Sequence, residues 1–436
     1  MTIDVSAGAS AGDSLSRIVS MTQPFDLLVG PIGRLAPCAG PAPRLGSDLQ
    51  TLPAAERGAV GIRGGEIAFV GSYDDVADHP ASERIDASGK TVLPGFVDPH
   101  THIPFVGDRA HELVMRLQGK SYMEIGAAGG GIHFTTRSVR EAKKEALLHA
   151  GKSLARKLLR SGVTTFEAKS GYGLQTDAEI KQLEVLRDLT EEVPQTVVPT
   201  FLGAHLIPRE YEGRGDAYVD LVCGEMIPLV AERKLARYCD VFCEEGAFTV
   251  EQSRRILLEG KKQGLAPRMH ADEIVDLGGA ALAAEVGAVS ADHLLAASKE
   301  GMAAMAKAGV SATLLPCTAF YLRKPYADAR ACIDAGCAVA LATDCNPGSS
   351  FTASMLQTVT LAVFGMGMMP EEALWAATLN AAYALREHET LGSLEPGKRA
   401  DLCIWDVPSP LHLFYPFGEN PIDTVVCNGG IVFKAS

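Results

Sequence analysis

Two histidines stand one residue apart after an apolar stretch of the chain. His100 and His102 follow the segment TVLPGFVDP. Residues i and i+2 of a strand face the same side, so both imidazoles can reach one metal ion. Similar apolar segments end in four further candidate residues, namely His205, His270, His293 and Asp344. Imidazoles together with one carboxylate suit zinc or iron. We therefore predict a metal site with four protein ligands and an open position for water.

Glu273 lies shortly after His270, in the segment HADE. If His270 ends a strand, Glu273 lies on the following loop or at the start of a helix, beside the same site. A carboxylate at this place can take a proton from water and deliver it to a leaving nitrogen. The alternative is a glutamate that only stabilises the N-terminus of a helix. The spacing alone favours neither interpretation.

Strand ends that are distant in sequence meet only in particular folds, and the chain shows the pattern of one of them. Between residues 93 and 345, short apolar strands such as GVTTFEAKS alternate with helical segments of about 10 to 15 residues, which is typical of βα units and a parallel sheet. About eight strands fit, which predicts a closed (β/α)8 TIM-like barrel with its active site at the carboxyl ends of the strands. We expect KTVLPGFVD to form one strand and residues 140–162 to form a helix.

Both ends of the chain are predicted to form β-structure. Gly64 and Gly65 indicate a hairpin between two apolar runs, and DTVVCNGGIVF lies near the C-terminus. Each end alone is too short for a core, so we predict one small β-sandwich domain built from both, within an α/β fold class. The predicted divisions are a flexible leader at 1–22, the β-sandwich domain at 23–93 and 388–436, and the barrel at 94–387.

The composition excludes several classes of protein. The chain has 436 residues, of which 47% are hydrophobic and 21% charged, as is ordinary for a folded globular protein. The net charge is −13 without a basic stripe, so nucleic acid and anionic membranes are not expected partners. No apolar run reaches the ~18 residues that cross a bilayer. The N-terminus lacks the pattern of a secretory signal and the ten cysteines are scattered, which predicts a cytoplasmic protein with reduced thiols.

Several motifs together resemble the imidazolonepropionases, a family of the amidohydrolase superfamily. They are FVDPHTHIPFVGDR, GGGI, TTFEAKSGYGL, AHLIP, HADE, ADHL, LLPCTAF and ATDCNPGSS, and the resemblance extends over nearly all of residues 24–434. It implies metal-dependent hydrolysis of the ring C–N bond of 4-imidazolone-5-propanoate to N-formimidoyl-L-glutamate, the third step of L-histidine degradation. It also implies one zinc or iron ion per subunit and a homodimer.

The resemblance also implies roles for individual residues. The implied metal ligands are His100, His102, His270 and Asp344. Glu273 would contact the substrate and move a proton, with His293 hydrogen-bonding near Asp344, so these three form the predicted catalytic group. The other implied substrate contacts are Arg109, Tyr122, Tyr172, His205, Asn346, Gly348 and Ser349. Lys169 is read as structural or as part of the substrate loop, although superfamily members with two metals use a carboxylated lysine as a bridge.

Arg109 and Tyr172 bear on the choice of substrate. The planar fork of an arginine can bind a propionate through two hydrogen bonds, while the alternative for Arg109 is a salt bridge with Asp108 or Glu112. Tyr172 lies between glycines, which favours contact with a ligand. Two other functions stay open, a deaminase acting on a purine or pyrimidine and a metal-binding scaffold without activity. Arg109 and Tyr172 favour a substrate with a carboxylate tail, which argues against the deaminase. The proton carrier Glu273 argues against the scaffold.

Overall fold

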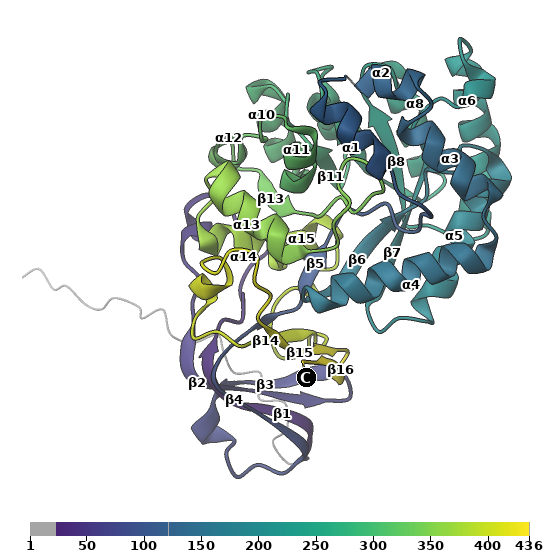
Figure 1. The fold of residues 1–436 in the computed structure, drawn as a ribbon. Coiled ribbons are helices and arrows are strands. Elements are labelled where there is room, and N and C mark those ends of the chain that lie inside the picture. Colours follow the sequence, from purple (N-terminus) through teal and green to yellow (C-terminus); the bar gives the residue numbers. More distant parts are fainter. Residues whose placement is uncertain (1–22, 121, 436) are drawn as a thin grey trace, which may run out of the picture.

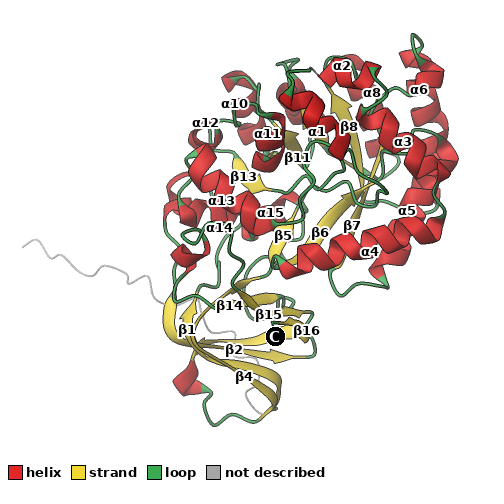
Figure 2. Ribbon diagram, in the orientation of Figure 1, coloured by secondary structure: helices red, strands yellow, loops and turns green. Residues whose placement is uncertain are grey.

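The computed structural model describes residues 23–120 and 122–435 of the chain. A parallel barrel surrounded by helices lies beside a sheet built from the two ends of the chain (Figures 1 and 2). The barrel strands follow one another in sequence order around the barrel. They are β5 (Phe96–Asp98), β6 (Val163–Lys169), β7 (Thr196–Ala204), β8 (Tyr238–Cys243), β10 (Met269–Ala271), β11 (Ser290–His293), β12 (Ser311–Leu314) and β13 (Ala338–Leu341), with β9 (Ala266–Pro267) paired to β8.

The barrel closes just beyond the ends of its first and last strands. Thr101 and Cys345 form an isolated parallel bridge. The backbone N–H of His102 donates to Cys345 O at 3.0 Å, and the N–H of Asp344 donates to His100 O at 3.0 Å. The segments that carry three of the predicted metal ligands therefore form the seam of the barrel. The predicted (β/α)8 barrel is confirmed.

Helices occupy the connections between the barrel strands. In α4, for example, Leu147, Leu154 and Leu158 are buried at helical spacing, which is the pattern of a helix that packs on a sheet. The helices are α1 (Ala110–Leu117), α2 (Tyr122–Ala127), α3 (Gly131–Glu141), α4 (Lys144–Arg160), α5 (Thr176–Thr190), α6 (Gly215–Leu221), α7 (Ile227–Glu232), α8 (Val250–Lys262), α9 (Gly279–Val286), α10 (Lys299–Ala308), α11 (Pro316–Leu322), α12 (Ala329–Asp334), α13 (Met355–Met366), α14 (Pro370–Ala377) and α15 (Leu379–Ala384). Shorter helical turns are η1 (Gly46–Gln50), η2 (Tyr73–Asp75), η3 (Arg209–Tyr211), η4 (Val222–Met226) and η5 (Pro410–Leu413).

The two ends of the chain share one seven-stranded sheet, in the order β16-β15-β14-β4-β1-β2-β3. Figure 1 shows the purple N-terminal strands beside the yellow C-terminal ones. The pair β4–β14 joins the two ends in antiparallel register, and the predicted hairpin at Gly64 and Gly65 links β2 to β3. The strands are β1 (Phe25–Leu35), β2 (Ala55–Arg63), β3 (Glu66–Ser72), β4 (Ala81–Pro94), β14 (Leu402–Trp405), β15 (Ile422–Cys427) and β16 (Gly430–Lys434). The predicted leader, 1–22, lies outside the described residues.

Two predicted elements have different bounds in the structure. KTVLPGFVD is divided at Gly95, so that its first part pairs in the terminal sheet and its second part is barrel strand β5. A Cβ at Gly95 would lie 2.2 Å from Thr164 Oγ1, which shows that only glycine fits at this junction. The helix predicted at 140–162 begins at Lys144, because α3 already occupies Gly131–Glu141. No helix in the described part of the chain combines the length and apolar character needed to cross a membrane.

Candidate active site

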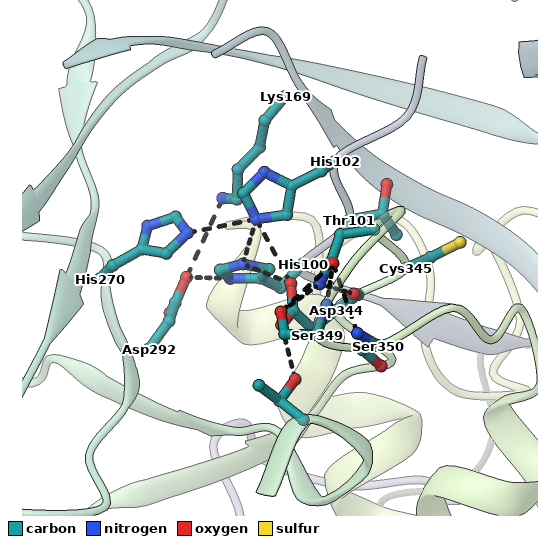
Figure 3. Close-up of polar contacts among 12 residues, drawn as sticks. His100, Thr101, His102, Lys169, His270, Asp292, Asp344, Cys345, Ser349 and Ser350 are labelled. Atoms are coloured by element: carbon teal, nitrogen blue, oxygen red, sulfur yellow. Dashed lines mark hydrogen bonds and ion pairs between the residues drawn. The ribbon is translucent and has the colours of Figure 1, made fainter. Parts of the chain in front are cut away.

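Three histidine rings meet at the carboxyl ends of the barrel strands. His100 and His102 follow β5, and His270 lies in β10. Nε2 of His102 lies 3.3 Å from Nε2 of His100 and 3.3 Å from Nε2 of His270. All three side chains are buried, and their ring nitrogens approach one point (Figure 3). Such a group can hold a metal ion.

Asp344 approaches the same point from the other side of the barrel seam. Its Oδ1 lies 3.3 Å from Nε2 of His102 and 3.5 Å from Nε2 of His100. This oxygen is buried and accepts no hydrogen bond from the described residues, whereas Oδ2 accepts one from the Thr318 hydroxyl at 2.5 Å. An unpaired buried carboxylate oxygen is costly. The residues present therefore fit a cation that takes three imidazoles and this oxygen.

The protonation of the histidines also fits a metal ion. Nδ1 of His100 lies 2.7 Å from Asp292 Oδ2, and Nδ1 of His270 lies 3.1 Å from Asp240 Oδ1. A carboxylate at Nδ1 holds the ring proton there and leaves the lone pair on Nε2. Burial lowers the pKa of His100 and of His102 well below the ordinary value. Neutral imidazole is the form that binds a metal.

Glu273 borders the histidine cluster. It lies in the loop before α9 (Gly279–Val286), and its neighbour Asp272, rather than Glu273, accepts the backbone N–H groups of Gly279 and Ala280 at the start of that helix. Its Oε1 lies 3.7 Å from Nδ1 of His293. Burial, and then the charge of Asp344, raises the pKa of Glu273 to about 8. Burial lowers the pKa of His293 to about 3, so this pair brings a proton carrier next to a neutral imidazole.

Arg109 lies in the same cavity as the histidine cluster and Glu273, which has a volume of about 470 Å³. Its side chain is only 4% exposed. Nε and Nη1 make no hydrogen bond to the described residues, and Nε lies 3.8 Å from Glu112 Oε1. The alternative salt bridge is thus present only as a long ion pair with Glu112, while Asp108 accepts from the backbone of Ala110. A buried guanidinium with unpaired N–H groups is suited to an anionic ligand.

The loop that follows Asp344 makes room for this guanidinium. Asn346 Oδ1 accepts hydrogen bonds from the backbone N–H groups of Gly348 and Ser349, both at 2.8 Å. A Cβ at Gly348 would lie 1.3 Å from Arg109 Nη2, so only glycine leaves space for the side chain. Asn346 and Ser349 line the cavity. The loop therefore both shapes the cavity and determines where Arg109 lies.

Tyr172 and His205 line the cavity next to His102. The His205 ring stacks on His102 with centroids 4.9 Å apart, and Tyr172 lies 5.7 Å from His102 by the same measure. Nδ1 of His205 lies 2.9 Å from the carbonyl oxygen of Gly171, to which it can donate, and this leaves Nε2 as an acceptor. Tyr122 starts α2, but its side chain lies outside the described residues.

The sequence reasoning missed the carboxylates that hold the histidines. Asp240 and Asp292 were not among the predicted site residues, and neither was Arg268, which donates to Asp292 at 3.2 Å. The available signal was a charged residue inside a fully buried strand, as in YCDVFC of β8. Because Asp and Lys are almost never fully buried unless paired, Asp240 and Lys169 in such strands indicate partners within the barrel.

Comparisons with known proteins agree with this geometry. The model of the amidohydrolase family matches residues 91–432. The curated imidazolonepropionase of Geobacillus kaustophilus is 53% identical over 396 residues, which cover 90% of this chain and 93% of the relative. That of Clostridium tetani is 48% identical over 92% of this chain and 96% of the relative.

The chain belongs to the imidazolonepropionase family. More distant proteins share the fold of this imidazolonepropionase-family chain. A zinc-bound adenosine deaminase from Xanthomonas campestris superposes with a TM-score of 0.68 at 19% identity, covering 94% of this chain and 93% of that one. Guanine deaminase from E. coli gives 0.67 at 17% identity, covering 94% and 100%. At such low identity these two likenesses show the fold alone.

Proposed function

We propose that the chain hydrolyses the ring C–N bond of 4-imidazolone-5-propanoate to N-formimidoyl-L-glutamate, the third step of L-histidine degradation. The observation that carries this proposal is the buried guanidinium of Arg109 in the same cavity as the histidine cluster. The cavity therefore contains a cation, Arg109, that can bind a carboxylate tail. Beside it lies the histidine cluster, which could hold a metal ion that activates water. Nucleobases lack such a tail, whereas the proposed substrate has one.

His100, His102, His270 and Asp344 would hold one metal ion. Zinc and iron both suit this set of nitrogen and oxygen donors. When bound, the ion supplies Lewis-acid chemistry that activates water and polarises a carbonyl. The chain's own contribution is to hold the four donors in place, to keep the imidazoles neutral and to leave one side of the site open to the cavity.

Glu273 is proposed to carry the proton. Its carboxylate accepts a proton from the attacking water and delivers it to the ring nitrogen that leaves, which is general base followed by general acid catalysis. Burial raises the pKa of Glu273 above its ordinary value, which suits a group that must release a proton as well as accept one. Nδ1 of His293 lies 3.7 Å from this carboxylate, beyond hydrogen-bond distance. Tyr172 and His205 lie against His102 and line the cavity, where they would contact the substrate.

Replacing Arg109 by lysine tests the proposed carboxylate contact. The ammonium cannot reproduce two parallel hydrogen bonds, and loss of such a pair in a desolvated cavity typically costs ~2–5 kcal/mol. We expect a raised KM for the natural substrate, because the tail is bound alike in ground and transition states. Steady-state kinetics with an imidazolone that lacks the propionate provides the comparison. If R109K impairs both substrates equally, Arg109 has only a structural role.

Gly348→Ala tests the placement of Arg109 without changing its charge. The new methyl group must displace the guanidinium, since its Cβ would lie 1.3 Å from Nη2. We expect KM to rise, as it should when Arg109 itself is replaced by alanine, and the double variant G348A/R109A to be no worse than R109A alone. Gly224→Ala is the matched control, because nothing lies within 4 Å of a Cβ at that position. Additive losses in the double variant would show that Gly348 acts independently of Arg109.

Turnover assays separate this function from that of a deaminase. The protein is incubated with imidazolone propionate, cytosine and guanine, with and without a chelator, while ultraviolet absorbance and ammonia are followed. We expect loss of imidazolone absorbance only in the absence of the chelator. Ammonia release from a nucleobase with no loss of imidazolone would overturn the proposal. The predicted homodimer is checked by light scattering, and the predicted cytoplasmic location by cell fractionation.

A further inference from the structure

A cluster of buried charges lies next to the histidines but does not line the cavity. Its members are fully buried, and they are Glu167, Lys169, Asp240, Arg268 and Asp292. Three carboxylates and two cations leave one net negative charge away from water. Burial of charges is expensive even when they are paired. We therefore consider which contacts these buried charges make with the proposed metal ligands.

Lys169 is the centre of this cluster. Its Nζ donates to Glu167 Oε1 at 2.7 Å and to Asp240 Oδ2 at 2.8 Å. It also lies 4.0 Å from Asp292 Oδ2, a contact drawn in Figure 3. One ammonium thus approaches three carboxylates from three different barrel strands, β6, β8 and β11.

Each of these carboxylates fixes part of the histidine group. Asp240 holds Nδ1 of His270, and Asp292 holds Nδ1 of His100. Glu167 Oε2 accepts a hydrogen bond from the backbone N–H of Thr101 at 3.2 Å. Thr101 lies between His100 and His102, so this bond fixes the backbone that carries both rings. Lys169 is therefore connected to His270 and to His100 through one carboxylate each, and to His102 through Glu167 and the Thr101 backbone.

We propose that Lys169 is a positioning residue of the metal centre, whose ammonium fixes Glu167 and Asp240 by hydrogen bonds and attracts Asp292, which Arg268 also holds, and thereby presets His100, His102 and His270. The inference rests on the proposed metal site and deepens it. An ammonium engaged by two carboxylates has no lone pair to offer to carbon dioxide. The role of Lys169 in this cluster is therefore that of a hydrogen-bond donor and ion-pair partner.

Lys169→Met tests this role, because methionine keeps an unbranched apolar stem and removes the ammonium. The affinity for Zn²⁺ is measured by competition with a chromophoric chelator, and the geometry by the absorption spectrum of the Co²⁺-loaded protein. We expect the affinity to fall about 10- to 100-fold, the usual effect of losing a group that orients metal ligands. The Co²⁺ spectrum should shift as well, because the rings are no longer held in one orientation.

The double variant E167Q/K169M separates positioning from charge balance. It has the same net charge in the cluster as the natural chain, so it should recover the melting temperature of the metal-free protein. We expect its Zn²⁺ affinity to stay low, because Asp240 and Asp292 still lack the ammonium. Arg330→Met is a control for stability alone, since it breaks an ion pair with buried Glu372, which is not a member of this cluster.

The outcomes distinguish failure of this inference from failure of the metal site itself. If the natural chain binds neither Zn²⁺ nor Co²⁺, the proposed metal site is wrong. If it binds them and K169M or the double variant binds Zn²⁺ equally tightly, Lys169 does not position the ligands. If neither variant folds while R330M does, Lys169 is required for folding rather than for the metal centre, and the inference is equally overturned.

Discussion

Replacing His100 or Asp344 by alanine is expected to abolish both metal binding and turnover. The two side chains lie on opposite sides of the barrel seam, with Nε2 and Oδ1 3.5 Å apart. Loss of either one leaves only three of the four proposed donors. The measurements are metal content by elemental analysis of the purified protein and the rate of loss of imidazolone absorbance.

A matched control for these variants is His149→Ala, which removes an exposed imidazole from α4. It should retain both metal and activity, and melting curves for all three variants show whether each one folds. Full activity without bound metal in H100A or D344A would refute the assignment of these ligands. Treatment of the natural chain with a chelator should reproduce the loss, and added Zn²⁺ or Fe²⁺ should restore it.

Glu273→Gln is expected to lower kcat by about 10²-fold or more, the usual size of a general acid–base contribution. Glutamine has nearly the same shape but cannot accept and release the proton. Metal content and KM should change little, because Glu273 is not among the proposed ligands. Steady-state kinetics and elemental analysis of the same preparation test both parts of this prediction.

Glu244→Gln is the control for the loop that carries Glu273. Glu244 is buried, and its Oε2 accepts the backbone N–H of Ile274 at 2.8 Å, so it holds the loop without lining the cavity. We expect a much smaller effect on kcat than in E273Q. A near-normal kcat in E273Q would mean that Glu273 is only a loop charge and that Asp344 or His293 moves the proton.

The barrel and the histidine group were predictable because both follow from local patterns. Apolar strands that alternate with helices indicate a parallel barrel, and ligands at strand ends then meet at one face. The HTH motif at 100–102 and the HADE motif at 270–273 occupy those ends in the structure. The division at Gly95 was not predictable, because it depends on a contact with Thr164 from another strand.

The surroundings of the histidines depend on residues far apart in sequence, and this limited the prediction. For Asp240 and Asp292, the local sequence shows only that a charged residue lies inside a strand. It does not indicate which histidine each carboxylate holds. Gly348 and Arg109 are likewise distant in the chain, yet they are in direct contact in the structure. For Arg109, the salt bridge is present only as a long ion pair with Glu112 that leaves Nε and Nη1 without hydrogen bonds to the described residues, and the propionate contact stays a prediction.

The seam of the barrel has a consequence for the order of events during synthesis. His100 and His102 emerge early from the ribosome, whereas Asp344 and the backbone that pairs with them emerge late. The edge of the N-terminal strand β4 that pairs with β14 also stays unpaired until β14 has been synthesised. A nascent chain therefore carries an incomplete set of donors and an open sheet edge until these later segments have been synthesised. The proposed donor set is thus complete only after Asp344 has been synthesised, and until β14 follows, β4 exposes an unpaired edge of the kind that can pair with another chain.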